Sequence, residues 1–270
     1  MRNEDSKANL RIIGAVIRRF HMPRLCVGQF NLDAAQARHA RQVLRLSEGS
    51  KVEVFDDAGA TAIGRLVFSG PVDAAVRVEI IEPAGHDKTL HLTVAAAIPK
   101  GQRADWMVEK LGELGVAALV PLIAARSIVV PQGTAKHQRW QRIATEAAKQ
   151  SRRQGVMRIE APTPISALLQ GKRSPGAALV LSTAGDAVPI VNAIVSRPPG
   201  DDLLLFLGPE GGWTNDELAA FADAQVRSVR LTDSILRVET AAIAAAAVVQ
   251  AMGAFRMDWP ECNQDCRSDS

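Results

Sequence analysis

A glycine-rich loop, Gly208-Pro209-Glu210-Gly211-Gly212, is the stretch of this chain best suited to binding a small molecule. Glycines lack side chains, so a ligand can approach the backbone closely. A phosphate would need a free helix N-terminus and no competing anion. Here Thr214 and Glu217 have the spacing of a capping box, and Glu210 lies within the loop. We therefore expect a neutral or cationic ligand, the alternative being a tight turn that binds nothing.

Two predicted strand–loop–helix units position the residues of this ligand-binding loop. The apolar run 203–207 is too short for a helix and stops at Gly208-Pro209, which predicts a buried strand before the loop. Residues 228–231 predict a second strand, 232–237 a loop, and 239–254 a helix of almost only small and apolar residues. The glycine loop and the start of the last helix are thus the expected walls of the site.

The two segments carry the motifs GPEGG-W-T-x-x-E-L and I-L-R-V-E-T-A-A, in that order. This pair resembles the C-terminal signature of the SPOUT methyltransferases, most closely the RsmE-type enzymes, which methylate N3 of a uridine in 16S ribosomal RNA. Their K-G…K-x-x-E-L-G pattern is matched between Lys100 and Gly115, and their E-A-x-x-Q-S-x-R pattern by 146–153. The resemblance covers roughly 22–258. Two departures are Arg152, in place of a small residue, and 232–234, in place of a glycine-containing loop.

The resemblance implies a C-terminal α/β domain with a parallel sheet and a trefoil knot, and a homodimer paired through the alanine-rich helix. It implies S-adenosylmethionine as cofactor. A cationic stabiliser of the uracil oxygen would be Arg237 or Arg153, and the base Glu210 or Glu239. The expected cofactor-binding residues are Thr183, Leu207, Gly208, Pro209, Glu210, Gly211, Gly212, Leu231, Ile235, Leu236, Thr240 and Ala241.

Arginines recur on two predicted helices. Asp33 with Gln36 predicts a helix start, and arginines then recur at helical spacing up to about Leu46. The helix 136–153 carries six basic residues against the single acid Glu146. Such faces are often merely solvated, but the resemblance makes them candidates for binding 16S ribosomal RNA. The RNA-binding candidates are Arg38, Arg41, Arg45, Arg126, Arg139, Arg142, Gln150, Arg152 and Arg153.

The patterns predict two domains. Residues 22–84 should form a small β-rich domain, for which the resemblance implies a PUA-like RNA-binding barrel, with strands at 51–55, 61–68 and 75–81. After a linker at 85–89, strands and helices alternate through 90–258, which favours a parallel sheet covered by helices on both faces. Residues 1–21 are expected to be a poorly ordered extension before a more natural start at Met22, and 259–270 a tail.

The composition of the chain narrows the range of possible functions. The net charge of +3 means that any nucleic-acid surface is local. Three cysteines, two of them in the tail without a nearby histidine, predict no disulfide framework and no metal site. No apolar run is long enough for a membrane span, and we expect a cytoplasmic protein. Two alternatives stay open: methylation of a ribose 2′-oxygen, and a catalytically silent RNA-binding protein.

Overall fold

The structure is a computed structural model that describes residues 17–70, 73–83, 90–131, 133–170, 177–197 and 202–258. The chain divides into two compact units, 1–85 and 86–270, and each is described by itself. The predicted linker, the tail with Cys262 and Cys266, and residues 1–16 of the predicted extension lie outside the described residues. Within the described part of the chain, no helix has the length and apolar character that crossing a bilayer requires.

The smaller unit is built on a five-stranded mixed sheet with the order β1-β3-β4-β5-β2. The strand β1 runs parallel to β3, and the other pairs are antiparallel. Apolar side chains such as Val52, Leu66 and Val76 are fully buried in the core of this unit. The strands are β1 (Arg18–His21), β2 (Gly28–Asn31), β3 (Lys51–Phe55), β4 (Thr61–Phe68) and β5 (Ala74–Val78).

The strand β1 corrects the expectation of a poorly ordered extension for its own residues, Arg18–His21, because they belong to the sheet. Phe20 is buried in the core, and Arg18 to His21 pair in register with 52–55 of β3. The side chain of Arg19 is also buried, where its Nε lies 3.2 Å from Oε1 of Glu53 and its guanidinium covers the ring of Phe55. A buried charge needs such a partner, and the partner comes from a strand distant in sequence.

The predicted helix after Asp33 is present but changes character. The Asp33 side chain accepts hydrogen bonds from two backbone N–H groups at the start of α2 (Ala34–Arg38), as a cap should. The chain then widens into a π-helical turn, η1 (His39–Val43), and Arg45 adopts a left-handed backbone with φ of 51°. The expected arginine stripe of one continuous helix is therefore wrong, because the arginines lie on segments of different helical period.

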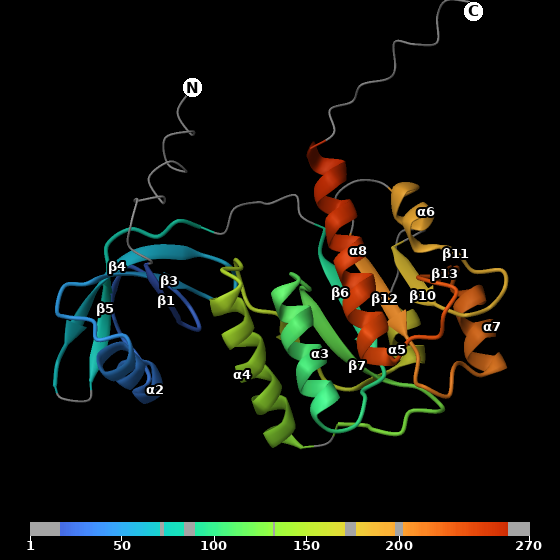
Figure 1. Ribbon diagram of the computed structural model, residues 1–270, viewed down its shortest axis with the longest axis horizontal. Helices are drawn as coiled ribbons and strands as arrows, with labels where there is room; N and C mark the ends of the chain where they lie inside the picture. The colour runs from blue at the N-terminus through green and yellow to red at the C-terminus, as the bar shows by residue number, and fades with distance from the viewer. Residues whose placement is uncertain are drawn as a thin grey trace, which may run out of the picture. The chain divides into compact units, whose positions relative to one another are not determined.

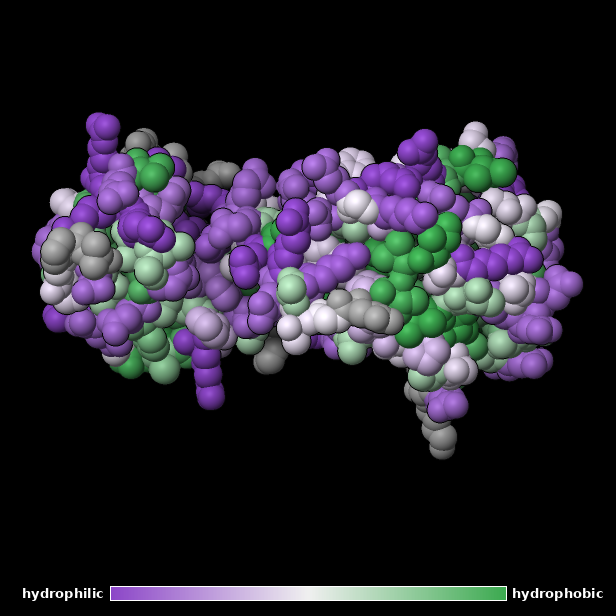
Figure 2. All heavy atoms as spheres, turned by 90° about the horizontal axis from the view of Figure 1, so that it is seen from below, coloured by the Kyte–Doolittle hydropathy of each residue, from purple (hydrophilic) through white to green (hydrophobic). Residues whose placement is uncertain are grey.

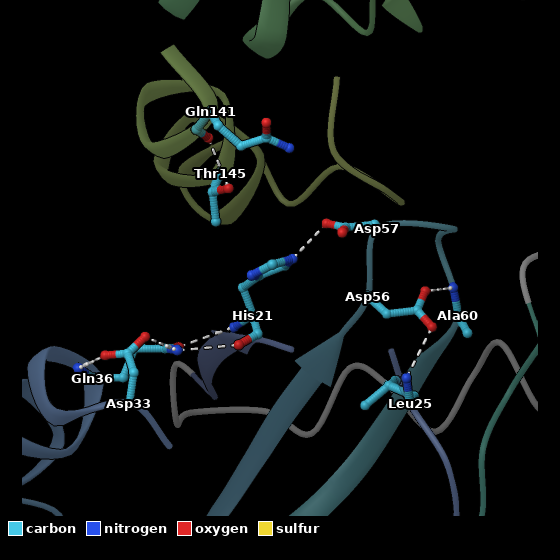
Figure 3. A network of polar contacts seen from close by, with 9 residues as sticks. All are labelled: His21, Leu25, Asp33, Gln36, Asp56, Asp57, Ala60, Gln141 and Thr145. Carbon is cyan, nitrogen blue, oxygen red and sulfur yellow. Dashed lines mark hydrogen bonds and ion pairs between the residues drawn. The ribbon is translucent and has the colours of Figure 1, made fainter. Parts of the chain in front are cut away.

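Polar side chains fix the loops of this unit to its sheet (Figure 3). Asp56 is buried, and its two carboxylate oxygens accept hydrogen bonds from the backbone N–H groups of Leu25 at 3.0 Å and Ala60 at 2.9 Å. The Gln36 side chain exchanges two hydrogen bonds with the backbone of His21, so α2 is held against β1. These hydrogen bonds explain how the Asp56 carboxylate can be buried directly after the strand β3, because both of its oxygens have donors.

The larger unit contains a parallel sheet with the order β11-β13-β10-β12-β6-β7-β8, with β9 paired to β7 outside this path. All of its strand pairs are parallel, as the alternation of elements predicted. The strands are β6 (Leu92–Ala96), β7 (Ala118–Ile123), β8 (Arg158–Ile159), β9 (Thr163–Pro164), β10 (Ala178–Leu181), β11 (Val188–Pro189), β12 (Leu203–Leu207) and β13 (Arg227–Arg230).

Helices cover both faces of this sheet (Figure 1). On one face α8 packs against α3, α6 and β6, and α4 packs against α3. On the other, α5 and α7 close a core that includes Phe206 and Phe221. The helices are α3 (Gln102–Glu113), α4 (Thr134–Gln150), α5 (Ile165–Leu169), α6 (Ile190–Val195), α7 (Asn215–Asp223) and α8 (Val238–Asp258).

The predicted capping box at the start of α7 is confirmed. The backbone N–H of Glu217 donates to Thr214 Oγ1 at 3.2 Å, and the backbone N–H of Thr214 donates to Glu217 Oε2 at 2.8 Å. Two donors of the helix start are therefore occupied by side chains, and the glycine loop enters a helix that does not offer them to a phosphate.

Candidate functional site

A cavity of about 450 Å³ lies beyond the carboxyl ends of β10, β12 and β13. In open α/β sheets this edge is where ligands bind. Three segments wall the cavity: 181–184, the glycine loop 207–213, and the loop after β13 with the start of α8. Every residue predicted to bind a cofactor lines it except Thr240, whose side chain is exposed on the first turn of α8.

The glycine loop keeps its shape through Trp213. The indole Nε1 donates to the backbone oxygen of Leu181 at 2.9 Å, and the ring meets Phe221 edge-on with centroids 4.9 Å apart. A Cβ at Gly208 would lie only 2.9 Å from the indole, so this position needs glycine for the close approach. Gly212 needs it for another reason, since its φ of 71° is a left-handed backbone.

Arg126 also holds the loop. Its Nη1 donates to the backbone oxygen of Gly211 at 2.7 Å, and nearby the backbone N–H of Ala125 donates to Glu217 Oε1 at 2.8 Å. The segment after β7 is thus tied to both the glycine loop and α7. Arg126 is one of the residues predicted to bind RNA, and the structure shows its guanidinium in contact with the glycine loop.

A charged cluster adjoins the loop, and sequence reasoning missed its centre, Arg103 on α3. Its Nη1 lies 3.0 Å from Glu210 Oε1 and 3.3 Å from Glu239 Oε1. Glu239 is 4% exposed, and its Oε2 has no hydrogen-bond partner among the described residues. The hydrogen bond to Glu210, with the further attraction of Glu239, raises the pKa of Arg103 above its ordinary value, so the guanidinium stays charged.

The structure does not bring the predicted catalytic arginines into the cavity wall. Arg237 is exposed immediately before α8, close in sequence to the wall residues Leu236 and Val238 but not among them. Arg153 lies at the opposite edge of the sheet, where its Nη1 donates to the backbone oxygen of Val116, before β7 begins. Burial, with a smaller contribution from Arg158, lowers the pKa of Arg153 to about 10.

The predicted RNA-binding residues fall into two groups. Some are held by partners: Arg139 pairs with Asp105 at 2.7 Å, and Arg41 donates to the Gly70 oxygen at 2.7 Å with its guanidinium over the ring of Phe68. Others have exposed side chains at the end of α2, after η1, and in the middle of α4 or at and beyond its end. This exposed group comprises Arg38, Arg45, Arg142, Gln150 and Arg152.

Family comparisons agree with the two units. The RNA methyltransferase domain family matches residues 86–250, and the RNA methyltransferase PUA domain family matches 32–77. A mixed-sheet unit followed by a parallel α/β unit with a cavity at its carboxyl edge therefore defines an RNA methyltransferase of the SPOUT class with an N-terminal PUA-like domain.

Relatives of this chain indicate one family within this class. The chain is 31% identical to Ribosomal RNA small subunit methyltransferase E of Synechocystis, over 82% of this chain and 72% of that protein. It is also 31% identical to the protein of the same name from Bacillus subtilis, over 82% and 89%. The chain belongs to the ribosomal RNA small subunit methyltransferase E family. A crystal structure of the Neisseria gonorrhoeae member bound to S-adenosyl methionine superposes with a TM-score of 0.75 at 30% identity, covering 88% and 98% of the two chains.

Proposed function

We propose that this protein transfers a methyl group from S-adenosylmethionine to N3 of a uridine in 16S ribosomal RNA. The observation that carries this proposal is the cavity at the glycine loop, whose wall contains nearly all of the residues that the resemblance assigns to the cofactor. The Neisseria gonorrhoeae relative, which binds S-adenosyl methionine, supports the choice of cofactor. The names of the relatives support the choice of RNA.

The wall residues fit this cofactor. A cavity of this volume is in the range of small-ligand sites. At Gly212 no protein atom lies within 4 Å of the position a Cβ would take, so an adenosine can approach its backbone, and the hydroxyls of Ser182 and Thr183 add polar contacts among apolar side chains. Glu210 would attract the positive sulfonium, as it would repel a phosphate. The capping box of α7 also argues against a phosphate ligand, because side chains already accept hydrogen bonds from the N–H groups at this helix start.

When bound, the cofactor supplies a methyl group on a cationic sulfur. The protein must then hold the uracil in line with that methyl and accept the N3 proton. Glu210 is the carboxylate of the cavity wall and is half exposed, so it can take this proton. Arg237, next in sequence to the wall residues Leu236 and Val238, would hold the phosphate or base of the incoming nucleotide. Because N3 lies on the pairing edge, the target uridine has to be unpaired or flipped out.

RNA contacts are proposed for the exposed residues of the predicted set, Arg38, Arg45, Arg142, Gln150 and Arg152. Arg126, Arg139 and Arg41 are better placed to order the protein, because each guanidinium donates to an oxygen of a segment distant in sequence, whereas Arg38 donates to the Ala34 oxygen of its own helix. Arg153 belongs with this second group, since it lies away from the cavity of its own chain.

We also propose a homodimer that pairs through the α/β unit. One side of α8 is partly exposed and apolar, formed by Ile243, Ala244, Ala247 and Val248. Figure 2 shows hydrophobic atoms gathered on one face of the larger unit, and exposed large side chains of this unit include Trp106, Ile128 and Ile235. Apolar surface of this kind favours association. Light scattering at micromolar protein concentration tests this, and a monomeric mass would contradict it.

The reaction is tested by incubating the protein with S-adenosylmethionine and small ribosomal subunits from cells that lack the gene, followed by nucleoside mass spectrometry. N3-methyluridine is the expected product. A ribose-methylated nucleoside would establish the alternative acceptor. A protein that binds no S-adenosylmethionine in calorimetry and yields no methylated nucleoside would refute the proposal in favour of a silent RNA-binding protein.

A further inference from the structure

A second cavity, of about 80 Å³, adjoins the cofactor cavity. The two share three wall residues, Pro209, Glu210 and Val238. The rest of the smaller cavity is formed by 97–100 after β6, by Arg103 of α3 and by Ile128 after β7. The two cavities therefore lie side by side along the carboxyl edge of the sheet, because β6 is the neighbour of β12.

The wall of this smaller cavity combines flat apolar groups with charges of both signs. Pro99, Ile128 and Pro209 can contact the face of a ring, while Lys100 and Arg103 offer N–H donors and Glu210 offers an acceptor. The pairing edge of uracil presents a carbonyl, the N3–H group and a second carbonyl. Donor, acceptor, donor on the protein complements acceptor, donor, acceptor on the base. Cytosine presents an acceptor at N3 and would place it against the Glu210 carboxylate.

Two ion pairs fix the position of the Arg103 guanidinium at the smaller cavity. Its Nη1 contacts Glu210 Oε1 at 3.0 Å and Glu239 Oε1 at 3.3 Å. Because Glu239 is buried at the start of α8, it anchors the guanidinium from below. A guanidinium carries five N–H donors, and these contacts occupy only Nη1, so further N–H groups remain for a carbonyl oxygen.

We propose that the smaller cavity receives the uracil edge of the target nucleotide, and that Arg103 stabilises the negative charge on a uracil carbonyl oxygen as N3 loses its proton. This rests on the proposed function. The N3 proton passes to the Glu210 carboxylate, the N3 electron pair forms the bond to the methyl carbon, and the pair of the breaking carbon–sulfur bond stays on sulfur. A volume of this size holds about two or three water molecules, so the base enters by its edge and displaces them.

The need for Arg103 follows from the weakness of the base. A carboxylate is a poor acceptor for an imide proton, so a charge held near the carbonyl oxygen, where the electrons move, gives the larger gain. Arg103 would then be the catalytic cation, a role that the resemblance had assigned to Arg237 or Arg153. Lysine at this position would keep the charge but lose the planar fork that reaches Glu210, Glu239 and the base together.

The test compares Arg103→Gln and Arg103→Lys with Arg227→Gln, an exposed arginine on β13 that bonds Ser196 and lies outside both cavity walls. The affinity for S-adenosylmethionine is measured by calorimetry. The rate of methylation is measured in single-turnover experiments on small subunits whose 16S RNA contains either uridine or 5-fluorouridine. Fluorine makes N3–H more acidic and stabilises the same negative charge.

We expect Arg103→Gln to slow methylation of uridine by about 100- to 1,000-fold, the usual loss for one charge-stabilising donor, while cofactor affinity changes less than threefold. On 5-fluorouridine the loss relative to wild type should shrink at least tenfold. Arg103→Lys should fall between, and Arg227→Gln should match wild type.

Three results would overturn this inference. One is wild-type rates for Arg103→Gln, another is an equal loss on both RNAs, and the third is a loss of cofactor affinity that accounts for the whole loss of rate. The last would mean that Arg103 only supports the glycine loop. Failure of the proposed function would look different, because the wild-type protein would then form no N3-methyluridine on either RNA.

Discussion

Replacing Gly208 with alanine should damage the cofactor cavity through a single steric contact. The added Cβ would lie 2.9 Å from Cε2 of Trp213 and 3.1 Å from two further indole atoms. The indole cannot easily yield, because it donates to Leu181 and its ring meets Phe221. Overpacking of this kind costs about 1–3 kcal/mol, and if the free loop relieves it by leaving the shape that binds the ligand, binding must restore that shape and affinity drops by roughly 5- to 150-fold.

Gly212→Ala is the matched control, because a Cβ there would meet nothing within 4 Å and the cost comes only from the left-handed backbone. Calorimetry with S-adenosylmethionine and urea unfolding measure both variants. In a Trp213→Leu background the additional cost of Gly208→Ala should fall below about 0.5 kcal/mol, whereas that of Gly212→Ala should persist, since only the first depends on the indole.

Wild-type affinity and stability in Gly208→Ala would refute the reasoning, as would an unchanged cost once the indole is removed. Either result would show that the loop relaxes without help from Trp213, and that the glycine serves another purpose.

Three further changes test other parts of the structure. Gly64→Ala would force a Cβ into side-chain and backbone atoms of the facing strand β5 and should destabilise the smaller unit by at least about 1–3 kcal/mol in urea unfolding, and an unchanged midpoint would contradict this. Glu217→Ala removes acceptors for two backbone N–H groups and should cost about 1–2 kcal/mol, against less than about 0.5 for the exposed Glu160→Ala, so equal losses would dismiss the cap. Arg153→Gln removes a charge whose folded-state pKa, about 10, lies below the ordinary pKa of an arginine in the unfolded chain. The charged form is therefore disfavoured by folding, and the variant should equal or exceed wild-type stability at pH 8, with any excess shrinking as the pH rises above 10, while a large loss at pH 8 would show that the contact to Val116 dominates.

Much of the fold was predictable because local patterns decided it. The strands at 51–55 and 61–68 were bounded by turn residues, and the cap at Thr214 was visible as a spacing of three residues. The strand β1 was not, because its few residues contain two arginines, and what makes one of them a core residue is Glu53 on another strand. Only the folded chain supplies that partner.

The site shows the same division. Glycines and small residues of the cavity wall lie in contiguous motifs, so a resemblance could find them. Arg103 is tied to the cavity by its ion pairs with Glu210 and Glu239, which are distant in sequence, and nothing in its own helix distinguishes it from a solvated arginine. Arg139 was expected to contact RNA on the strength of its helix face, and the structure adds an ion pair with Asp105 of a neighbouring helix that the sequence did not indicate. Charge counts along one element do not reveal such pairings.

The position of Trp213 gives the protein an optical signal of its own. Its indole lines the cavity, whereas the two other tryptophans that the structure describes do not: Trp140 is buried in the packing of α4, and Trp106 faces solvent on α3. Ultraviolet emission from this one ring should therefore change in wavelength or intensity as the cavity fills, without any attached dye. Titrations could then be followed in a cuvette, and the speed of filling in a stopped-flow instrument.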